Sequence, residues 1–143
     1  MKVTKEVTFD SAHMLSNYRG KCRNLHGHTY KLQVTLEGDI SSEGDSKGMV
    51  MDFNELKQYI DSITNTYDHA IIFSDADNRG EAEDALYHWA EKYNMNFIVV
   101  PGKSTSECIA IDIKAKILCA LPSVEMGHIT VRIWETPTSF AEV

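Results

Sequence analysis

Disulfide pairs, long apolar runs and an excess of positive charge are all missing from this sequence of 143 residues, and each absence excludes a class of protein. Three cysteines at irregular spacing argue against a disulfide framework and favour reduced thiols in the cytoplasm. Apolar runs such as residues 97–100 are only a few residues long, so we expect no membrane span. The formal net charge of −7 disfavours nucleic acid as a partner.

Internal repeats, low-complexity segments and a Gly-rich dinucleotide fingerprint are also missing. The start of the chain alternates polar and apolar residues, unlike a signal peptide. The apolar fraction of 43% is too high for a disordered chain and is sufficient for a core. Only residues 38–48 resemble a linker, and we interpret them as an exposed loop. We therefore expect a single domain over residues 1–143.

Two long stretches alternate between apolar and polar residues, which predicts half-buried strands at residues 2–12 and 28–37. A loop joins them, and an antiparallel pair is the simplest connection. Further strands are expected at residues 97–100, 128–135 and 138–143.

Apolar residues at helical spacing predict three helices. Asp52 begins the first helix and has a glutamate three residues later, which is the spacing of a capping box. The second helix runs near residues 81–93. Ser104 and Glu107 repeat the capping-box spacing and open the third helix, which ends before Pro122. Strands and helices are segregated along the chain, which favours an α+β domain with helices on one face of an antiparallel sheet.

Two histidines, His26 and His28, stand two residues apart at the start of a predicted strand, so their side chains point to the same face. His13 follows the partner strand, and antiparallel pairing brings it beside them. Three neutral nitrogen ligands suit zinc, and a vacant fourth position makes such a site catalytic. The alternative is three unrelated histidines, but their convergence favours a metal site.

Cys22 precedes His26 by four residues, in a loop that also carries Arg19, Lys21 and Arg23. Nearby cations favour the thiolate. The thiol is then either a base or nucleophile, or a fourth zinc ligand in a closed structural site. The remaining cysteines, Cys108 and Cys119, fall in an apolar helix, and we expect both to be buried.

Three carboxylates each allow a structural and a functional interpretation. Asp68 can orient the adjacent His69 for acid–base chemistry, although by spacing alone the histidine is better explained by the dipole at a helix C-terminus. Glu135 continues the inward face of its strand, where it needs a partner, either a structural cation or a ligand with two N–H groups. Glu107 either caps its helix or contacts a ligand.

These residues belong to motifs that extend over nearly the whole chain. The motifs are FDSAH, CRNLHGHTYK, GMVMDFNELK, YDH, STSE and WETPTSFAEV. In them the sequence resembles the 6-pyruvoyltetrahydropterin synthase and 6-carboxytetrahydropterin synthase family, which has the tunnelling fold. The resemblance implies a four-stranded antiparallel sheet with helices on one face. It also implies trimers whose sheets join into a β-barrel, and a homohexamer of two stacked trimers with active sites between subunits.

The resemblance further assigns roles to single residues. The implied ligands of Zn²⁺ are His13, His26 and His28; the implied catalytic residues are Cys22, Asp68, His69 and Glu135; and the implied substrate-binding residues are Thr105, Ser106, Glu107 and Glu135. Cys22 is the implied proton-abstracting base. Asp68 and His69 form the implied relay, with His69 supplied by a neighbouring subunit, and Glu135 is the implied anchor of the pterin.

The substrate that the resemblance implies is 7,8-dihydroneopterin triphosphate. The compact spacing from Cys22 to His26 and the ETPTS segment favour the 6-carboxy branch. That branch forms 6-carboxy-5,6,7,8-tetrahydropterin, acetaldehyde and triphosphate, in the synthesis of queuosine or other deazapurines. Two alternatives stay open, namely the reaction that forms 6-pyruvoyltetrahydropterin and a non-catalytic, zinc-stabilised binding protein.

Overall fold

Two long strands form the centre of the sheet, β1 (Lys2–His13) and β2 (His26–Glu37). They pair antiparallel along their whole length, which confirms the expected pair. Side chains on one face of this pair are more buried than those that alternate with them, as their pattern predicts. The end of β1 therefore meets the start of β2, with His13 directly opposite His26.

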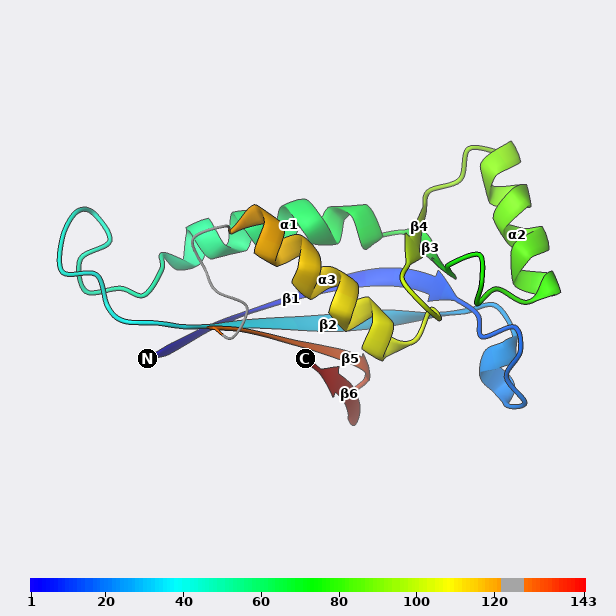
Figure 1. The fold of residues 1–143 in the computed structure, drawn as a ribbon, viewed down its shortest axis with the longest axis horizontal. Coiled ribbons are helices and arrows are strands. Elements are labelled where there is room, and N and C mark those ends of the chain that lie inside the picture. The colour runs from blue at the N-terminus through cyan, green and yellow to red at the C-terminus, as the bar shows by residue number, and fades with distance from the viewer. Residues whose placement is uncertain (122–127) are drawn as a thin grey trace.

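The computed structural model describes residues 1–121 and 128–143 (Figure 1). The other elements, in chain order, are η1 (Lys21–Arg23), α1 (Phe53–Tyr67), β3 (Ala70–Ser74), α2 (Glu81–Lys92), β4 (Phe97–Val100), α3 (Ser106–Ala120), β5 (Ile129–Thr136) and β6 (Ser139–Glu142). The sheet runs in the order β4-β3-β1-β2-β5-β6.

The four-stranded antiparallel sheet that the resemblance implied is wrong, because the sheet has six strands. Two neighbouring pairs, β1 with β3 and β3 with β4, are also parallel. The sequence analysis missed β3 because its residues do not alternate: four of its five residues are buried. A short apolar run of this kind carries no periodic signal that distinguishes a strand from its surroundings.

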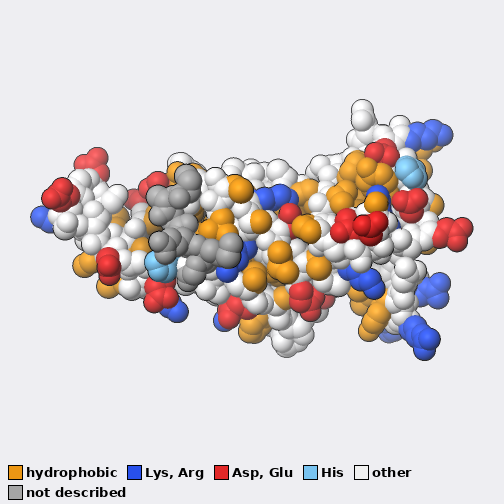
Figure 2. Space-filling view, viewed as in Figure 1, with side chains coloured by type: hydrophobic (Ala, Val, Ile, Leu, Met, Phe, Trp, Pro, Cys, Tyr) orange, Lys and Arg blue, Asp and Glu red, His pale blue; other side chains and the backbone are white. Residues whose placement is uncertain are grey.

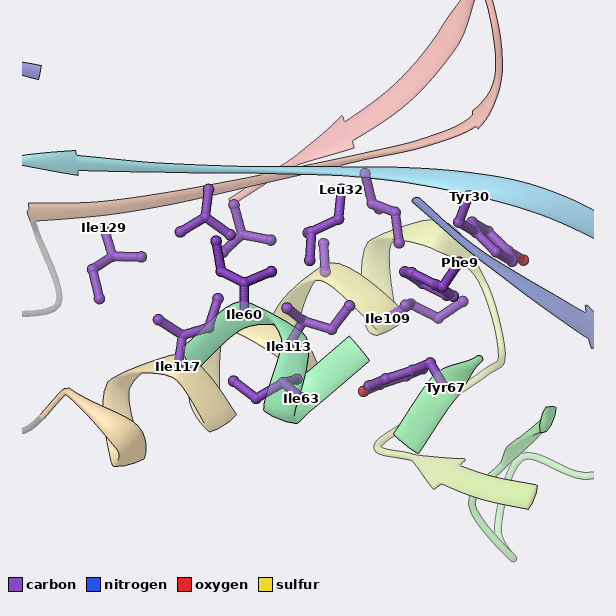
Figure 3. Packing of buried hydrophobic residues seen from close by; sticks show 14 of the residues in the cluster. Phe9, Tyr30, Leu32, Ile60, Ile63, Tyr67, Ile109, Ile113, Ile117 and Ile129 are labelled. Atoms are coloured by element: carbon purple, nitrogen blue, oxygen red, sulfur yellow. The ribbon is translucent and has the colours of Figure 1, made fainter. Parts of the chain in front are cut away.

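Two helices, α1 and α3, cover one face of the sheet, as expected (Figure 1). Figure 3 shows the core that fills the space between these helices and the strands. Its labelled members are Phe9, Tyr30, Leu32, Ile60, Ile63, Tyr67, Ile109, Ile113, Ile117 and Ile129. Burial of these apolar side chains is the main favourable contribution to folding.

The remaining helix, α2, lies beyond the end of the central strands and not in the layer of α1 and α3 (Figure 1). Its aromatic residues Trp89 and Tyr93 are 45% and 56% exposed, whereas its buried residues are Glu83 and Ala90. A carboxylate therefore faces the rest of the protein beside Tyr87, which packs against Phe73 and Phe97. None of the helices in the described part is long and apolar enough to cross a membrane.

The starts of the two packed helices differ in how well the sequence predicted them. Asp52 caps α1 as expected, and its side chain accepts hydrogen bonds from two backbone N–H groups of the first turn. The N-cap of α3 is Thr105 and not Ser104, so the capping box expected there is wrong by one residue. Cys108 is half-buried as part of this helix, but Cys119 is exposed, contrary to expectation.

Candidate active site

The three histidines of the predicted metal site converge where β1 ends and β2 begins. The ring centroids of His13 and His26 are 4.6 Å apart, those of His26 and His28 are 4.9 Å apart, and those of His13 and His28 are 5.2 Å apart. One ring nitrogen from each lies within 4.8 Å of the other two. The antiparallel register and the alternation of β2 account for this convergence, as the sequence predicted.

Backbone carbonyl groups fix the tautomers of two of these rings. Nδ1 of His13 lies 2.6 Å from the carbonyl oxygen of Ser104, and Nδ1 of His26 lies 2.8 Å from that of Asn24. A carbonyl oxygen only accepts, so both Nδ1 atoms carry the proton and both Nε2 atoms present lone pairs. Such second contacts are typical of histidines that bind metals.

The arrangement of the Nε2 atoms fits a tetrahedral cation. The Nε2 atoms of His13 and His26 are 3.1 Å apart. Zinc–nitrogen bonds of about 2.0–2.1 Å in tetrahedral geometry place two ligands roughly 3.3 Å apart. Nε2 of His28 is buried and has no hydrogen-bond partner within the described residues. The two lone pairs of His13 and His26, which face one another without a proton donor, and the unpaired Nε2 of His28 are all groups that a shared cation would stabilise.

Burial keeps two of these imidazoles in the neutral form that binds metal. It lowers the pKa of His13 and of His28 and is the largest cause in each case. The nearby carboxylate of Glu135 acts in the opposite direction on both. The side chain of His13 is 1% exposed and that of His28 is 19% exposed, so the site opens toward His28.

Glu135 reaches this group from β5. Its Oε1 lies 3.4 Å from Nε2 of His13 and 3.8 Å from Nε2 of His28. The side chain is 30% exposed, so part of the carboxylate stays open to a ligand. The inward direction that the alternation of β5 predicts for Glu135 is confirmed, and the groups that it faces are His13 and His28.

Cys22 lies in η1 and is half-buried. Within the described residues, the group that can hold a metal ion consists of the three histidines without this thiol. This geometry disfavours a closed four-ligand site. The neighbouring cations Arg19, Lys21 and Arg23 are exposed, and Figure 2 shows Lys and Arg side chains at the end of the molecule where Figure 1 places residues 19–23.

Asp68 and His69 form a contact that the sequence left open. Oδ2 of Asp68 lies 2.8 Å from Nδ1 of His69, and Oδ1 accepts a hydrogen bond from the backbone N–H of Asp10 at 2.9 Å. The Asp10 bond and then the His69 bond lower the pKa of the Asp68 carboxyl. His69 adopts a φ of +57° and its side chain is 79% exposed, so its ring projects into solvent.

His69 lines a hollow of about 470 Å³. The lining also includes Asp10, Ala12, Gly27 and Thr29. On β1 and β2 these four alternate with the residues that face the helices, but His28 of the metal site also lines the hollow. The exposed ring of His69 therefore lies at a hollow that also borders the metal site.

The implied substrate-binding residues Thr105, Ser106 and Glu107, and Ser104 before them, make separate contacts in the structure. The carbonyl group of Ser104 contacts His13, as described above. The hydroxyl group of Thr105 caps α3, and Ser106 contacts Glu107 at 3.5 Å. Glu107 lines a separate hollow of about 230 Å³ with the last residues of the chain.

Comparison with known proteins decides the family. The model of the family described as 6-pyruvoyl tetrahydropterin synthase matches residues 2–143. This chain belongs to that family. It is 41% identical to 6-carboxy-5,6,7,8-tetrahydropterin synthase of Haemophilus influenzae, over 99% of this chain and 96% of that protein. It is 39% identical to a putative 6-carboxy-5,6,7,8-tetrahydropterin synthase of Pyrococcus abyssi, over 98% of this chain and 86% of that protein.

Solved structures of 6-pyruvoyltetrahydropterin synthases share the fold. A catalytic-residue mutant of the Plasmodium vivax protein has a TM-score of 0.73 at 22% identity, over 100% of this chain and 96% of that chain. The Caenorhabditis elegans protein has a TM-score of 0.67 at 25% identity, over 100% of this chain and 94% of that chain. The chain is thus an α+β member of an enzyme family, as the motifs implied.

Sequence reasoning missed two features of this family member's site. One is Tyr30, which continues the row of His26 and His28 on β2 and lies 5.4 Å from His28 between ring centroids. Its position two residues after His28 could have indicated it. The other is the role of Ser104, whose carbonyl group no side-chain motif could reveal.

Proposed function

We propose that the protein is a zinc-dependent lyase that converts 7,8-dihydroneopterin triphosphate and water to 6-carboxy-5,6,7,8-tetrahydropterin, acetaldehyde and triphosphate. The observation that carries the proposal is the convergence of one ring nitrogen from each of three histidines in a group that does not include the Cys22 thiol. Three protein ligands leave a coordination position for substrate. The name of the Haemophilus influenzae relative supports this product.

The proposed division of labour follows the contacts. His13, His26 and His28 hold the cation through Nε2. Bound zinc supplies Lewis acidity toward the hydroxyl oxygens of the substrate side chain. Cys22 acts as the base that removes a proton from this side chain, and the exposed cations Arg19, Lys21 and Arg23 lie beside it in the sequence.

Two carboxylates orient the remaining partners. Asp68 holds the proton of His69 on Nδ1, so Nε2 of His69 exchanges a second proton with the substrate. Glu135 accepts hydrogen bonds from the amino and ring N–H groups of the pterin, and its position beside the histidines places the ring next to the reacting side chain. In this proposal Thr105, Ser106 and Glu107, at the start of α3, also bind the substrate.

In this proposal each active site lies between subunits of a homohexamer made of two stacked trimers. The support is that the side chain of His69 is 79% exposed and lines an open hollow that also borders His28, so a neighbouring chain has access to both. A neighbouring subunit then supplies the relay to each zinc site. The product enters queuosine or deazapurine synthesis in the cytoplasm.

Product analysis tests the proposal. The zinc-loaded protein is incubated with 7,8-dihydroneopterin triphosphate and all products are identified by mass spectrometry. We expect 6-carboxy-5,6,7,8-tetrahydropterin with equimolar acetaldehyde. Formation of 6-pyruvoyltetrahydropterin and triphosphate without acetaldehyde would instead establish the second candidate function, which the names of the solved relatives favour. Unchanged substrate in the presence of bound zinc would show a non-catalytic binding protein.

A further inference from the structure

Glu83, in the first turn of α2, is a buried carboxylate that no catalytic role explains. It is 1% exposed. Its Oε1 accepts a hydrogen bond from the backbone N–H of Ser74 at 2.8 Å, and its Oε2 accepts one from the hydroxyl group of Ser16 at 3.0 Å. The Ser16 oxygen in turn accepts from the backbone N–H of Gly80 at 2.9 Å, so the single hydroxyl proton of Ser16 points to Glu83.

The hydrogen bonds continue from Ser74 to the metal site. The backbone N–H of Ser104 donates to the hydroxyl oxygen of Ser74 at 3.0 Å, and the hydroxyl group of Ser104 donates to the carbonyl oxygen of Met14 at 3.1 Å. Both serines are at most 1% exposed. The carbonyl oxygen of Ser104 then accepts the proton on Nδ1 of His13 at 2.6 Å. An unbroken buried series of contacts thus links Glu83 to His13.

Each contact in this series restrains the next group. Glu83 holds the backbone of Ser74 at the end of β3, and Ser74 holds the peptide N–H of Ser104. The peptide group before Ser104 and its own carbonyl group are then fixed relative to β1. A metal-binding histidine needs such a fixed acceptor on its second nitrogen, because that acceptor sets both the tautomer and the ring direction.

We propose that Glu83 is a positioning residue for the metal site, acting through Ser74 and Ser104 to hold the Nε2 lone pair of His13 toward the shared cation. The inference rests on the zinc site of the proposed function, but it concerns residues outside that site and makes a statement about metal binding alone. Glu83 touches neither the cation nor the substrate.

Metal affinity measured without substrate tests this role. Co²⁺ is titrated into the apo forms of the full-length wild-type protein, Glu83→Ala and Glu83→Gln, and the dissociation constant is obtained by competition with a chelator. The visible absorption of bound Co²⁺ reports the ligand geometry. All titrations are made at a temperature where circular dichroism shows each variant folded. Loss of an outer contact typically weakens metal binding about 10- to 100-fold, and we expect Glu83→Ala to fall in this range with an altered spectrum.

Two matched variants separate positioning from general destabilisation. Glu83→Gln keeps a carbonyl oxygen that can accept from the N–H of Ser74, so it should restore affinity to within about threefold of wild type. Ala90→Gly weakens the same helix at its other buried residue without touching the series, so it should lose stability but keep both affinity and spectrum.

The outcomes are distinct. A folded Glu83→Ala variant with the affinity and spectrum of the wild type would overturn the inference while leaving the zinc site intact. If Glu83→Ala does not fold, Ser74→Ala replaces it. That variant removes only the acceptor for Ser104, and unchanged Co²⁺ affinity there would equally overturn the inference. Failure of the wild type itself to bind Co²⁺ would instead contradict the proposed function.

Discussion

At the scale of single residues, the site depends on which ring nitrogen of each histidine carries the proton. Carbonyl oxygens take the Nδ1 protons of His13 and His26, which leaves two Nε2 lone pairs 3.1 Å apart. Buried lone pairs that face one another without a donor destabilise a protein. These facing lone pairs therefore lower the stability of the metal-free chain, and a bound cation removes this destabilisation.

Tyr30 gives a prediction about an unpaired hydroxyl group. Its side chain is fully buried, and burial raises its pKa, so the group stays protonated. Within the described residues its oxygen has no hydrogen-bond partner. Tyr30→Phe should therefore leave the free energy of unfolding unchanged or raise it by up to about 1 kcal/mol in urea denaturation.

Tyr67→Phe is the matched control for this measurement. The hydroxyl group of Tyr67 donates to Asp112 and accepts from Lys116, so its removal should lower the free energy of unfolding by about 1–2 kcal/mol. An equally large loss in Tyr30→Phe would mean that the Tyr30 hydroxyl group has a partner in solution.

Asp68 gives a prediction about pH. Its folded pKa lies below the ordinary value of 3.8, chiefly because of the Asp10 N–H and then His69. A carboxyl group with a lowered folded pKa contributes stability above its unfolded pKa and loses it as the pH falls through the folded pKa. Asp68→Asn should therefore be less stable than wild type at neutral pH, with a difference that narrows below pH 3.8. Thermal unfolding across pH measures this, and a constant difference would contradict it.

At the scale of elements, the sequence predicted the strands that carry the histidines because alternation fixes which residues share a face. The antiparallel connection then fixed which ends meet, with His13 opposite His26. The sequence could not predict the contact between His13 and Ser104, which are 91 residues apart and meet through a backbone carbonyl group. Nor could it predict β3, whose buried residues show no period, or the buried side of α2, where Glu83 takes the place expected of an apolar residue.

Helix α1 gives a prediction at this scale, because one side chain caps its start. Asp52 accepts hydrogen bonds from the backbone N–H groups of Asn54 and Glu55. Asp52→Ala should lower the free energy of unfolding by about 1 kcal/mol, whereas Asp52→Asn, which keeps an acceptor, should lose only a few tenths. Equal losses in the two variants, measured by chemical denaturation, would show that the charge and not the cap stabilises the helix.

At the scale of the whole molecule, the sheet has helices on one face and leaves the other open, and the exposed side chain of His69 lines a hollow beside His28. A histidine that is open to solvent is accessible to another copy of the chain. The proposed assembly uses this exposure, since a homo-oligomer repeats one interface around a symmetry axis and brings every His69 to an equivalent neighbouring site.

Mixing two inactive variants tests this arrangement. Cys22→Ala and His69→Ala should each abolish turnover alone. If His69 serves a neighbouring subunit, random mixing of the two variants leaves roughly a quarter of the sites with both an intact Cys22 and an intact His69. The mixture should then have about a quarter of the wild-type activity. If each chain used its own His69, no mixed site would hold both groups. Absence of any recovery after subunit exchange, confirmed by native mass spectrometry, would exclude shared sites.

The most direct measurement is the zinc content per chain of wild type, Cys22→Ala and His26→Ala, determined by plasma mass spectrometry after dialysis. We expect one zinc per chain in wild type and in Cys22→Ala, which should retain the metal while losing turnover, and none in His26→Ala. Loss of zinc from Cys22→Ala would show that the thiol completes a closed site. Full retention by His26→Ala would show that the three imidazoles do not bind the metal.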